Sequence, residues 1–192
     1  MDNWAFIIAG IGTFALAVMT FYIEIIGPFW NRACFSIEFE NKEPFCRVTR
    51  VTDTKIHAYY IRLRVYNSGR SVAKNCLGKI TKVTDVDGKE LVDYDPVQLG
   101  WVGTKLDTIP LSTIDLNAKD FEYLNLVYVR SDNAGVAYIA KDELPRGTTV
   151  CFFSRSYIIQ VTIYGQNVKP ISKEYLLTVG PTRFHDIKLE PR

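Results

Sequence analysis

Histidine is scarce in this sequence, and the motifs of familiar enzymes are absent. The chain of 192 residues has two histidines, His57 and His185, and neither belongs to an H-x-x-x-H or Cys/His spacing that binds zinc. It also lacks a G-x-S-x-G elbow, a Walker loop and a dinucleotide fingerprint. The sequence therefore predicts a protein that is not an enzyme, with no catalytic residue, no metal ligand and no cofactor.

Clustered charge of one sign is also missing. The 23 basic and 21 acidic residues give a net charge of +2 and are spread along the chain. Because nucleic-acid binding usually needs a clustered basic face, we expect no nucleic-acid partner. There is no internal repeat or low-complexity segment, and 47% hydrophobic residues can form a core, so one globular domain is predicted.

Cysteines are few, and no C-x-x-C pair occurs among them. An even number of cysteines is compatible with a disulfide framework or with free thiols. Cys34 and Cys46 flank a predicted hairpin, whereas apolar neighbours such as Phe152 favour small core residues. The redox state is therefore left open for all four: Cys34, Cys46, Cys76 and Cys151.

Charge is absent from one long stretch near the N-terminus. Residues 4–23 read WAFIIAGIGTFALAVMTFYI, which is about 20 residues and predicts a transmembrane helix. Met1-Asp2-Asn3 is acidic and no small-x-small cleavage site follows, so we expect a retained anchor rather than a signal peptide. Trp4 and Trp30 would lie at the two headgroup levels, and Gly27-Pro28 would end the helix.

Two further expectations depend on this predicted helix. Small residues recur every four positions and would let a second helix approach closely, which predicts self-association. These residues are Ala5, Ala9, Thr13 and Ala17. Lys and Arg occur only after the helix, beginning with Arg32, so the positive-inside rule predicts a single-pass membrane protein with its soluble domain in the cytoplasm.

Downstream of Trp30 the hydrophobic period is two, which is typical of β-strands. We predict a membrane segment over 1–30 and an all-β domain over 31–192, with two antiparallel sheets packed as a β-sandwich. A small closed barrel is the alternative. The predicted strands are 33–39, 45–51, 57–66, 75–84, 89–93, 97–101, 121–130, 136–140, 149–153, 157–164, 171–179 and 184–190.

In the predicted strand over 57–66, apolar residues alternate with arginines. Ile61, Leu63 and Val65 point to one face, which predicts the core side, and the arginines between them point to the solvent side. A basic and aromatic patch on the solvent side would bind a protein, a glycan or anionic headgroups. The alternative is an ordinary solvated sheet whose arginines prevent aggregation. The candidate partner-binding face is Tyr60, Arg62, Arg64, Tyr66, Arg70 and Lys74.

The same strand ends on Asn67-Ser68-Gly69, which predicts a crossover turn with a positive φ at Gly69. Together with Ala73 and Asn75, this stretch resembles the V-x-N-x-G-x-x-x-A-x-N pattern of CARDB-like prokaryotic immunoglobulin-type modules. The resemblance covers mainly residues 57–84, and the stretch 91–149 is longer than a minimal module needs. It implies an immunoglobulin-like sandwich with an adhesion, scaffolding or sensing role and no catalytic residues.

Two local features have alternative interpretations. Four aspartates occur within a short span, and acidic loops of β-sandwiches bind calcium, but Asp87-Gly88 is also the preferred dipeptide of a tight hairpin turn. The aspartates are Asp85, Asp87, Asp93 and Asp95. Trp101, beside Gly100, is expected in the core rather than at a rim.

Function is predicted from these parts. The first hypothesis is a membrane-anchored, non-enzymatic binding or scaffold protein that presents its sandwich to a protein partner, as an accessory subunit of a membrane complex. The alternatives are an extracytoplasmic adhesion module that binds a glycan or calcium, and a component of an enzyme or transporter whose site follows no familiar motif.

Overall fold

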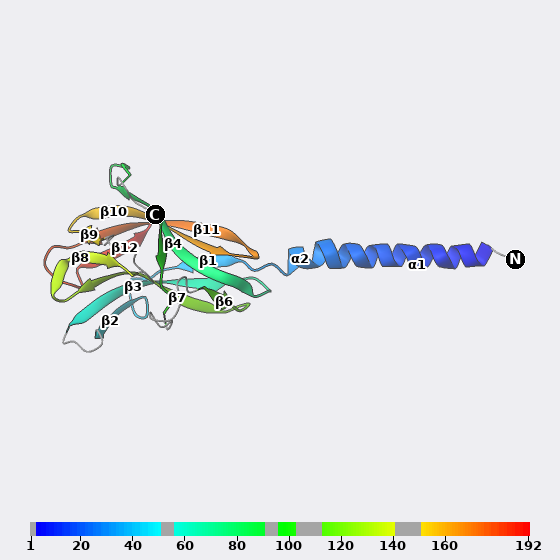
Figure 1. The fold of residues 1–192 in the computed structure, drawn as a ribbon, viewed down its shortest axis with the longest axis horizontal. Helices are drawn as coiled ribbons and strands as arrows, with labels where there is room; N and C mark the ends of the chain where they lie inside the picture. Colours follow the sequence, from blue (N-terminus) through cyan, green and yellow to red (C-terminus); the bar gives the residue numbers. More distant parts are fainter. Residues whose placement is uncertain (1–2, 51–55, 91–95, 103–112, 141–150) are drawn as a thin grey trace.

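The chain has a helical N-terminal segment followed by a β domain, and the two lie apart in Figure 1. This computed structural model describes residues 3–50, 56–90, 96–102, 113–140 and 151–192. The helical segment comprises α1 (Asn3–Phe21), the π-helix η1 (Tyr22–Ile26) and α2 (Gly27–Trp30). Most large apolar side chains described in α1 are exposed, including Ile11 and Phe14.

The predicted transmembrane helix over 4–23 is not supported. Among the residues that the structure describes, no helix is both long and apolar enough to cross a membrane. A span needs about 20 consecutive apolar α-helical residues. Instead, α1 ends at Phe21 after 19 residues and continues as η1, which contains Glu24. The prediction of a single-pass membrane protein with a cytoplasmic domain was therefore wrong.

The predicted end of the helix at Gly27-Pro28 was also wrong. The chain continues from η1 directly into α2 and stays helical to Trp30. Proline breaks a helix when it lies in the interior, but Pro28 lies in the first turn of α2, where the missing N–H and the fixed φ are tolerated. The change to π-helix over Tyr22–Ile26 therefore places the proline at a new helical start.

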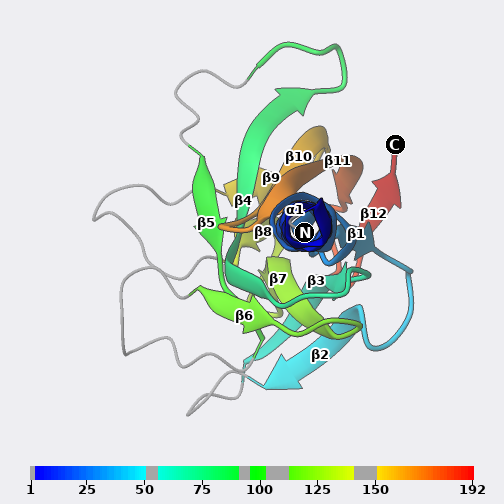
Figure 2. The same cartoon turned by 90° about the vertical axis from the view of Figure 1, so that its right-hand side faces the viewer.

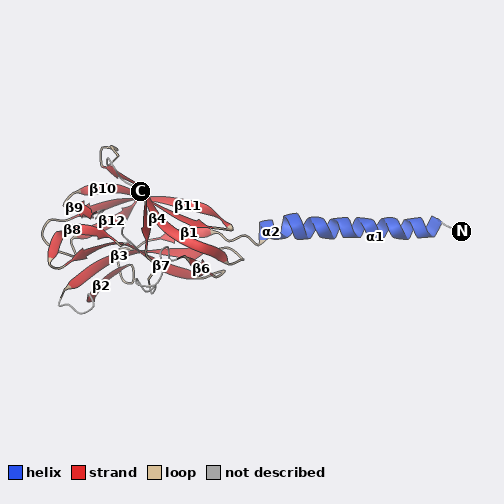
Figure 3. Cartoon of the chain, in the orientation of Figure 1, coloured by secondary structure: helices blue, strands red, loops and turns tan. Residues whose placement is uncertain are grey.

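The β domain consists of two antiparallel sheets, and the prediction of a β-sandwich is confirmed at this level (Figures 2 and 3). The first sheet has the order β1-β3-β7-β8-β9, with β2 also paired to β3, and the second has the order β12-β11-β10-β4-β5, with β6 paired to β4. The strands are β1 (Phe35–Glu38), β2 (Cys46–Arg50), β3 (His57–Asn67), β4 (Ala73–Asp85), β5 (Val97–Leu99), β6 (Ile114–Leu116), β7 (Phe121–Arg130), β8 (Asn133–Ile139), β9 (Cys151–Phe153), β10 (Ser156–Gly165), β11 (Val168–Val179) and β12 (Ile187–Pro191).

Most predicted strands match an observed one, with two differences. The short strand β6 was not predicted, because it has three residues and pairs with β4 only through two register positions. The predicted strand 89–93 is described only at its start, where Glu90 forms an isolated bridge with Thr84, and the rest lies outside the described residues. The Asp85–Lys89 turn is confirmed as a tight hairpin with Gly88 at φ 83°.

A single hydrophobic core lies between the two sheets. It combines alternate residues of β3, such as Ile61 and Leu63, with those of β10 and β11, such as Ile159 and Leu177. Trp101 is 2% exposed, and its indole N–H donates to the Cys76 carbonyl at 3.3 Å, which confirms its predicted core position. All four cysteines are free thiols, and Cys46 and Cys76 are buried while Cys34 is exposed.

Asn67 is a buried polar residue at the end of β3, on the core side of the strand. Its Oδ1 accepts the backbone N–H groups of Cys34 at 3.1 Å and Gly69 at 3.0 Å. Its Nδ2 donates to three carbonyls, of Ser71 at 2.7 Å, Leu116 at 3.0 Å and Asn117 at 3.1 Å. The side chain therefore joins the segment before β1, the turn after β3 and the end of β6.

Gly69 is required for a different reason from the predicted one. Positive φ is found at Gly88 but not at Gly69, so that part of the prediction was wrong. A Cβ at position 69 would lie 2.3 Å from the Arg32 carbonyl oxygen and 2.6 Å from the Ala33 Cα. The segment that follows α2 thus passes over the turn so closely that only glycine fits beneath it.

Tyr175 on β11 is fully buried, and its hydroxyl has no hydrogen-bond partner among the described residues. An unpaired buried hydroxyl costs about 1–3 kcal/mol. We expect Tyr175→Phe to raise the free energy of unfolding by about 1 kcal/mol near neutral pH, measured by urea unfolding. A loss of stability would instead mean that the hydroxyl makes an essential bond.

The same substitution has a pH signature. Burial raises the pKa of Tyr175, and burial with a hydrogen bond to Cys46 raises the pKa of Tyr59 to about 12. The unfolded chain loses these protons above about pH 10, so stability is constant below that pH and falls as the pH rises toward the folded values. Tyr175→Phe should make this alkaline decrease less steep.

Candidate functional site

The outer face of the first sheet carries a set of tyrosine and arginine side chains. From Tyr60 onward the residues of β3 alternate, so that Tyr60, Arg62, Arg64 and Tyr66 are half-buried while Ile61, Leu63 and Val65 between them are fully buried. This confirms the predicted inside and outside faces of the strand. Cross-strand pairing extends the outer face to β2, β7 and β8. We call this set the tyrosine–arginine face: Arg47, Tyr60, Arg62, Arg64, Tyr66, Tyr128 and Tyr138.

A ladder of three stacked tyrosines crosses this face. Register places Tyr60 opposite Tyr128 and Tyr128 opposite Tyr138. The ring centroids are 5.3 Å and 5.4 Å apart, with interplanar angles of 26° and 24°. Burial raises the pKa values of Tyr60 and Tyr128, so both hydroxyls are neutral at pH 7. The three rings thus form a continuous, half-exposed aromatic strip.

Arg62 lies beside the ladder and is fixed by neutral groups. Its Nε donates to Oδ1 of Asn125 at 3.0 Å, and its guanidinium carbon lies 5.5 Å from the centroid of the Tyr60 ring. Burial and the nearby charge of Arg47 lower its pKa, although the group remains cationic at neutral pH. Arg62 is thus a preorganised cation without a carboxylate partner among the described side chains.

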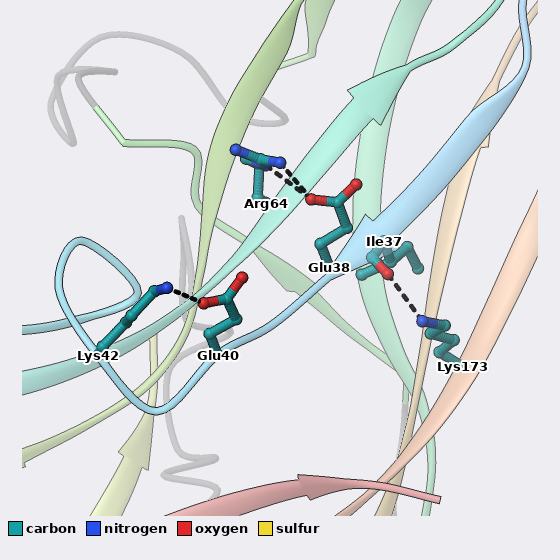
Figure 4. Close-up of polar contacts among 6 residues, drawn as sticks. All are labelled: Ile37, Glu38, Glu40, Lys42, Arg64 and Lys173. Atoms are coloured by element: carbon teal, nitrogen blue, oxygen red, sulfur yellow. Dashed lines mark hydrogen bonds and ion pairs between the residues drawn. The ribbon is translucent and has the colours of Figure 1, made fainter.

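Arg64 is different because it is neutralised within the sheet. Its Nε donates to Oε2 of Glu38 at 3.0 Å, and its Nη2 also contacts that oxygen (Figure 4). Its guanidinium carbon lies 5.1 Å from the centroid of the Phe121 ring. Because Glu38 stands on β1, the pair fastens β1 to β3, and such half-exposed ion pairs contribute about 0.2–1 kcal/mol.

Other polar contacts near β1 are structural as well. Lys173 of β11 donates to the Ile37 carbonyl oxygen at 2.8 Å and so links the second sheet to β1 of the first sheet (Figure 4). Lys42 pairs with Glu40 in the segment between β1 and β2. The side of the face near β1 is thus occupied by internal contacts.

The structure does not bring all six predicted site residues together. Arg70 lies in the turn after β3, where its N–H donates to the Arg32 carbonyl oxygen at 3.2 Å beside the helical segment. Lys74 lies on β4 of the second sheet, where its N–H donates to Oδ1 of Asn167 at 2.9 Å. Arg70 thus lies in the turn after β3 and Lys74 on the other sheet, whereas the remaining four predicted residues lie on β3.

Sequence reasoning missed three members of the face. All three lie in strands that were predicted, and the alternation of Arg47 and Tyr138 with their apolar neighbours could have placed these two on an outer face. Tyr128 shares the phase of Leu124 and Leu126, and it reaches the outer face only because the register of β3 and β7 shifts beside them. The sequence does not reveal which strands are neighbours, so it could not show that they adjoin Tyr60.

The outer face of the second sheet has a different chemistry. Hydroxyl and amide groups pair with one another there, as in the contact of Thr81 with Gln160 at 3.0 Å and of Thr162 with Ser172 at 2.8 Å. A hollow of about 160 Å³ lies over this sheet, which is smaller than the roughly 300–1,000 Å³ of a typical small-molecule pocket. Among the described residues, the stacked, half-exposed tyrosines lie on the first sheet.

Of the four aspartates considered for calcium, Asp85 and Asp87 lie within the described residues. Oδ1 of Asp85 accepts the N–H groups of Asp87 and Lys89 at 3.0 Å and 2.9 Å, which is a turn-forming role. Asp93 and Asp95 lie outside the described residues. Within the described part of the chain, no group of three or more His, Cys, Asp or Glu residues is arranged to hold a metal ion.

Neither a protein-family model nor a curated protein matches the chain. The resemblance to CARDB-like modules therefore stays a prediction. So does self-association through the helix, because the side chains of Ala5 and Ala9 lie outside the described residues.

Proposed function

We propose that this chain is a non-enzymatic binding protein that presents the tyrosine–arginine face to a protein partner. The observation that carries the proposal is the half-exposed ladder of Tyr60, Tyr128 and Tyr138 with arginines beside it. Tyrosine and arginine are enriched at protein interfaces, where they dominate the binding energy. Stacked rings lose little conformational freedom on binding, because the neighbouring rings already restrict them.

An immunoglobulin-like sandwich suits such a role, since a rigid sheet can hold a flat binding surface in place. The contrast between the two sheets supports the choice of face. Hydroxyl groups of the second sheet, such as Thr162, are paired within the sheet, whereas the aromatic edges of the first remain half-exposed.

Site-specific photo-crosslinking tests the proposal. A benzophenone amino acid replaces Tyr138 on the ladder in one variant and Lys188 on β12 in a control variant, and the full chain is irradiated in its native cells. We expect a covalent adduct with a protein from position 138 and none from position 188, because the two positions lie on different sheets. Equal adducts at both positions, or none at 138, would refute the assignment of this face.

A further inference from the structure

Two arginines on the tyrosine–arginine face form a pair of like charges that the described residues do not neutralise. Arg47 of β2 lies opposite Tyr60 of β3, and Arg62 lies two residues further along the same face. Such diagonal neighbours in a sheet are about 7–8 Å apart, within reach of long side chains. Their mutual repulsion contributes to the lowered pKa of Arg62.

Two other arginines of this sheet have acidic partners. Arg64 pairs with Glu38, and Arg130 pairs with Asp132 at the β7–β8 turn. No ion pair among the described residues joins Arg47 or Arg62 to a carboxylate. Uncompensated positive charge is therefore concentrated at one place, where a half-buried cation repels its neighbour. A bound anion would relieve this repulsion.

The geometry of Arg62 suits such an anion. Its Nε is occupied by Asn125, which fixes the plane of the guanidinium and leaves the terminal nitrogens as donors for a carboxylate. The tyrosine ladder begins at Tyr60, directly beside both arginines. An aromatic side chain next to the anion would pack on that ladder with the offset or edge geometry that ring pairs prefer.

We propose that Arg47 and Arg62 bind a carboxylate of an acidic segment of the protein partner, while the Tyr60–Tyr128–Tyr138 ladder binds an aromatic residue of the same segment. The inference rests on the proposed function and adds the chemistry of the partner. The two positive charges favour an acidic segment. The three successive tyrosine rings beside them offer an aromatic surface for a neighbouring aromatic residue of that segment.

Binding of three blocked, dye-labelled peptides to the full chain tests the proposal by fluorescence anisotropy. The peptides are Glu-Glu-Tyr-Glu-Glu, its uncharged analogue Gln-Gln-Tyr-Gln-Gln, and Glu-Glu-Ala-Glu-Glu, which lacks the ring. We expect the first to bind more tightly than the second by about tenfold or more, and the third to fall between them. Added salt should weaken the first more than the second.

Matched variants locate the binding. Arg47→Gln and Arg62→Gln should each weaken the binding of Glu-Glu-Tyr-Glu-Glu about tenfold. Lys188→Gln removes the same charge from the second sheet and should change affinity by less than about twofold. Tyr138→Ala should make the tyrosine and alanine peptides bind equally. Arg47 is exposed, so its substitution tests binding even if Arg62→Gln perturbs folding.

Several results would overturn the inference. They are equal binding of the acidic and glutamine peptides, no effect of Arg47→Gln, or an equal effect of Lys188→Gln, which would indicate nonspecific attraction. If none of the peptides binds but crosslinking at position 138 still gives a protein adduct, the partner does not bind through an acidic segment, and the proposed function is retained. If that adduct is also absent, the proposed function is refuted.

Discussion

Replacement of Asn67 by alanine is expected to lower the free energy of unfolding by about 3 kcal/mol or more. The substitution removes one acceptor that serves two N–H groups and one donor that serves three carbonyl oxygens. Asn67 is 0% exposed, so water cannot easily replace these bonds. Each unpaired buried group costs about 1–3 kcal/mol, although the turn will partly relax.

Urea unfolding of the full chain, followed by tryptophan fluorescence, measures this loss. Trp101 is buried and reports on the sandwich, whereas Trp4 and Trp30 are exposed in both states. Asn133→Ala is the matched control, because its amide makes one exposed hydrogen bond, to the Tyr138 hydroxyl at 2.6 Å. The control should cost about 0.5 kcal/mol or less.

Asn67→Asp separates the two halves of the network. Aspartate keeps an acceptor for the two N–H groups but places a second oxygen against the carbonyls that Nδ2 now serves. We expect a loss at least as large as that of Asn67→Ala. If both variants unfolded like Asn133→Ala, Asn67 would not join the three segments, and the turn after β3 would be held by its backbone alone.

The two faces of β3 from Tyr60 onward could be predicted from the sequence because their physical cause is local. A period of two places Ile61 and Leu63 on one side and Arg62 on the other, whichever strands are neighbours. The pairing of the strands has no such local cause. The tyrosine ladder needs β7 between β3 and β8, and sequence periodicity does not specify that order.

In the helical segment, composition alone was not enough to predict the length of the α-helix. An uncharged stretch identifies apolar residues but does not determine how many consecutive residues keep the α-helical form. Here the hydrogen-bond pattern changes at Tyr22, and Pro28 begins a further turn instead of ending the helix. In β6, by contrast, three residues form a strand because their partners Ala73 and Cys76 lie beside them, which is a tertiary cause.

Gly69→Ala should destabilise the chain by about 3 kcal/mol, because the new Cβ meets backbone atoms of the segment 32–34 at 2.3–2.6 Å. Gly88→Ala is the contrasting control. Its Cβ would meet nothing within 4 Å, but φ is +83°, so the cost is the left-handed backbone alone, about 1–2 kcal/mol.

Asparagine distinguishes these two causes, because it tolerates positive φ better than alanine but has a larger side chain. Gly88→Asn should therefore recover much of the stability lost in Gly88→Ala, whereas Gly69→Asn should be at least as damaging as Gly69→Ala. Urea unfolding of the four variants tests this ordering. Recovery by Gly69→Asn would show that backbone conformation, and not the close passage of residues 32–34, demands glycine in the turn after β3.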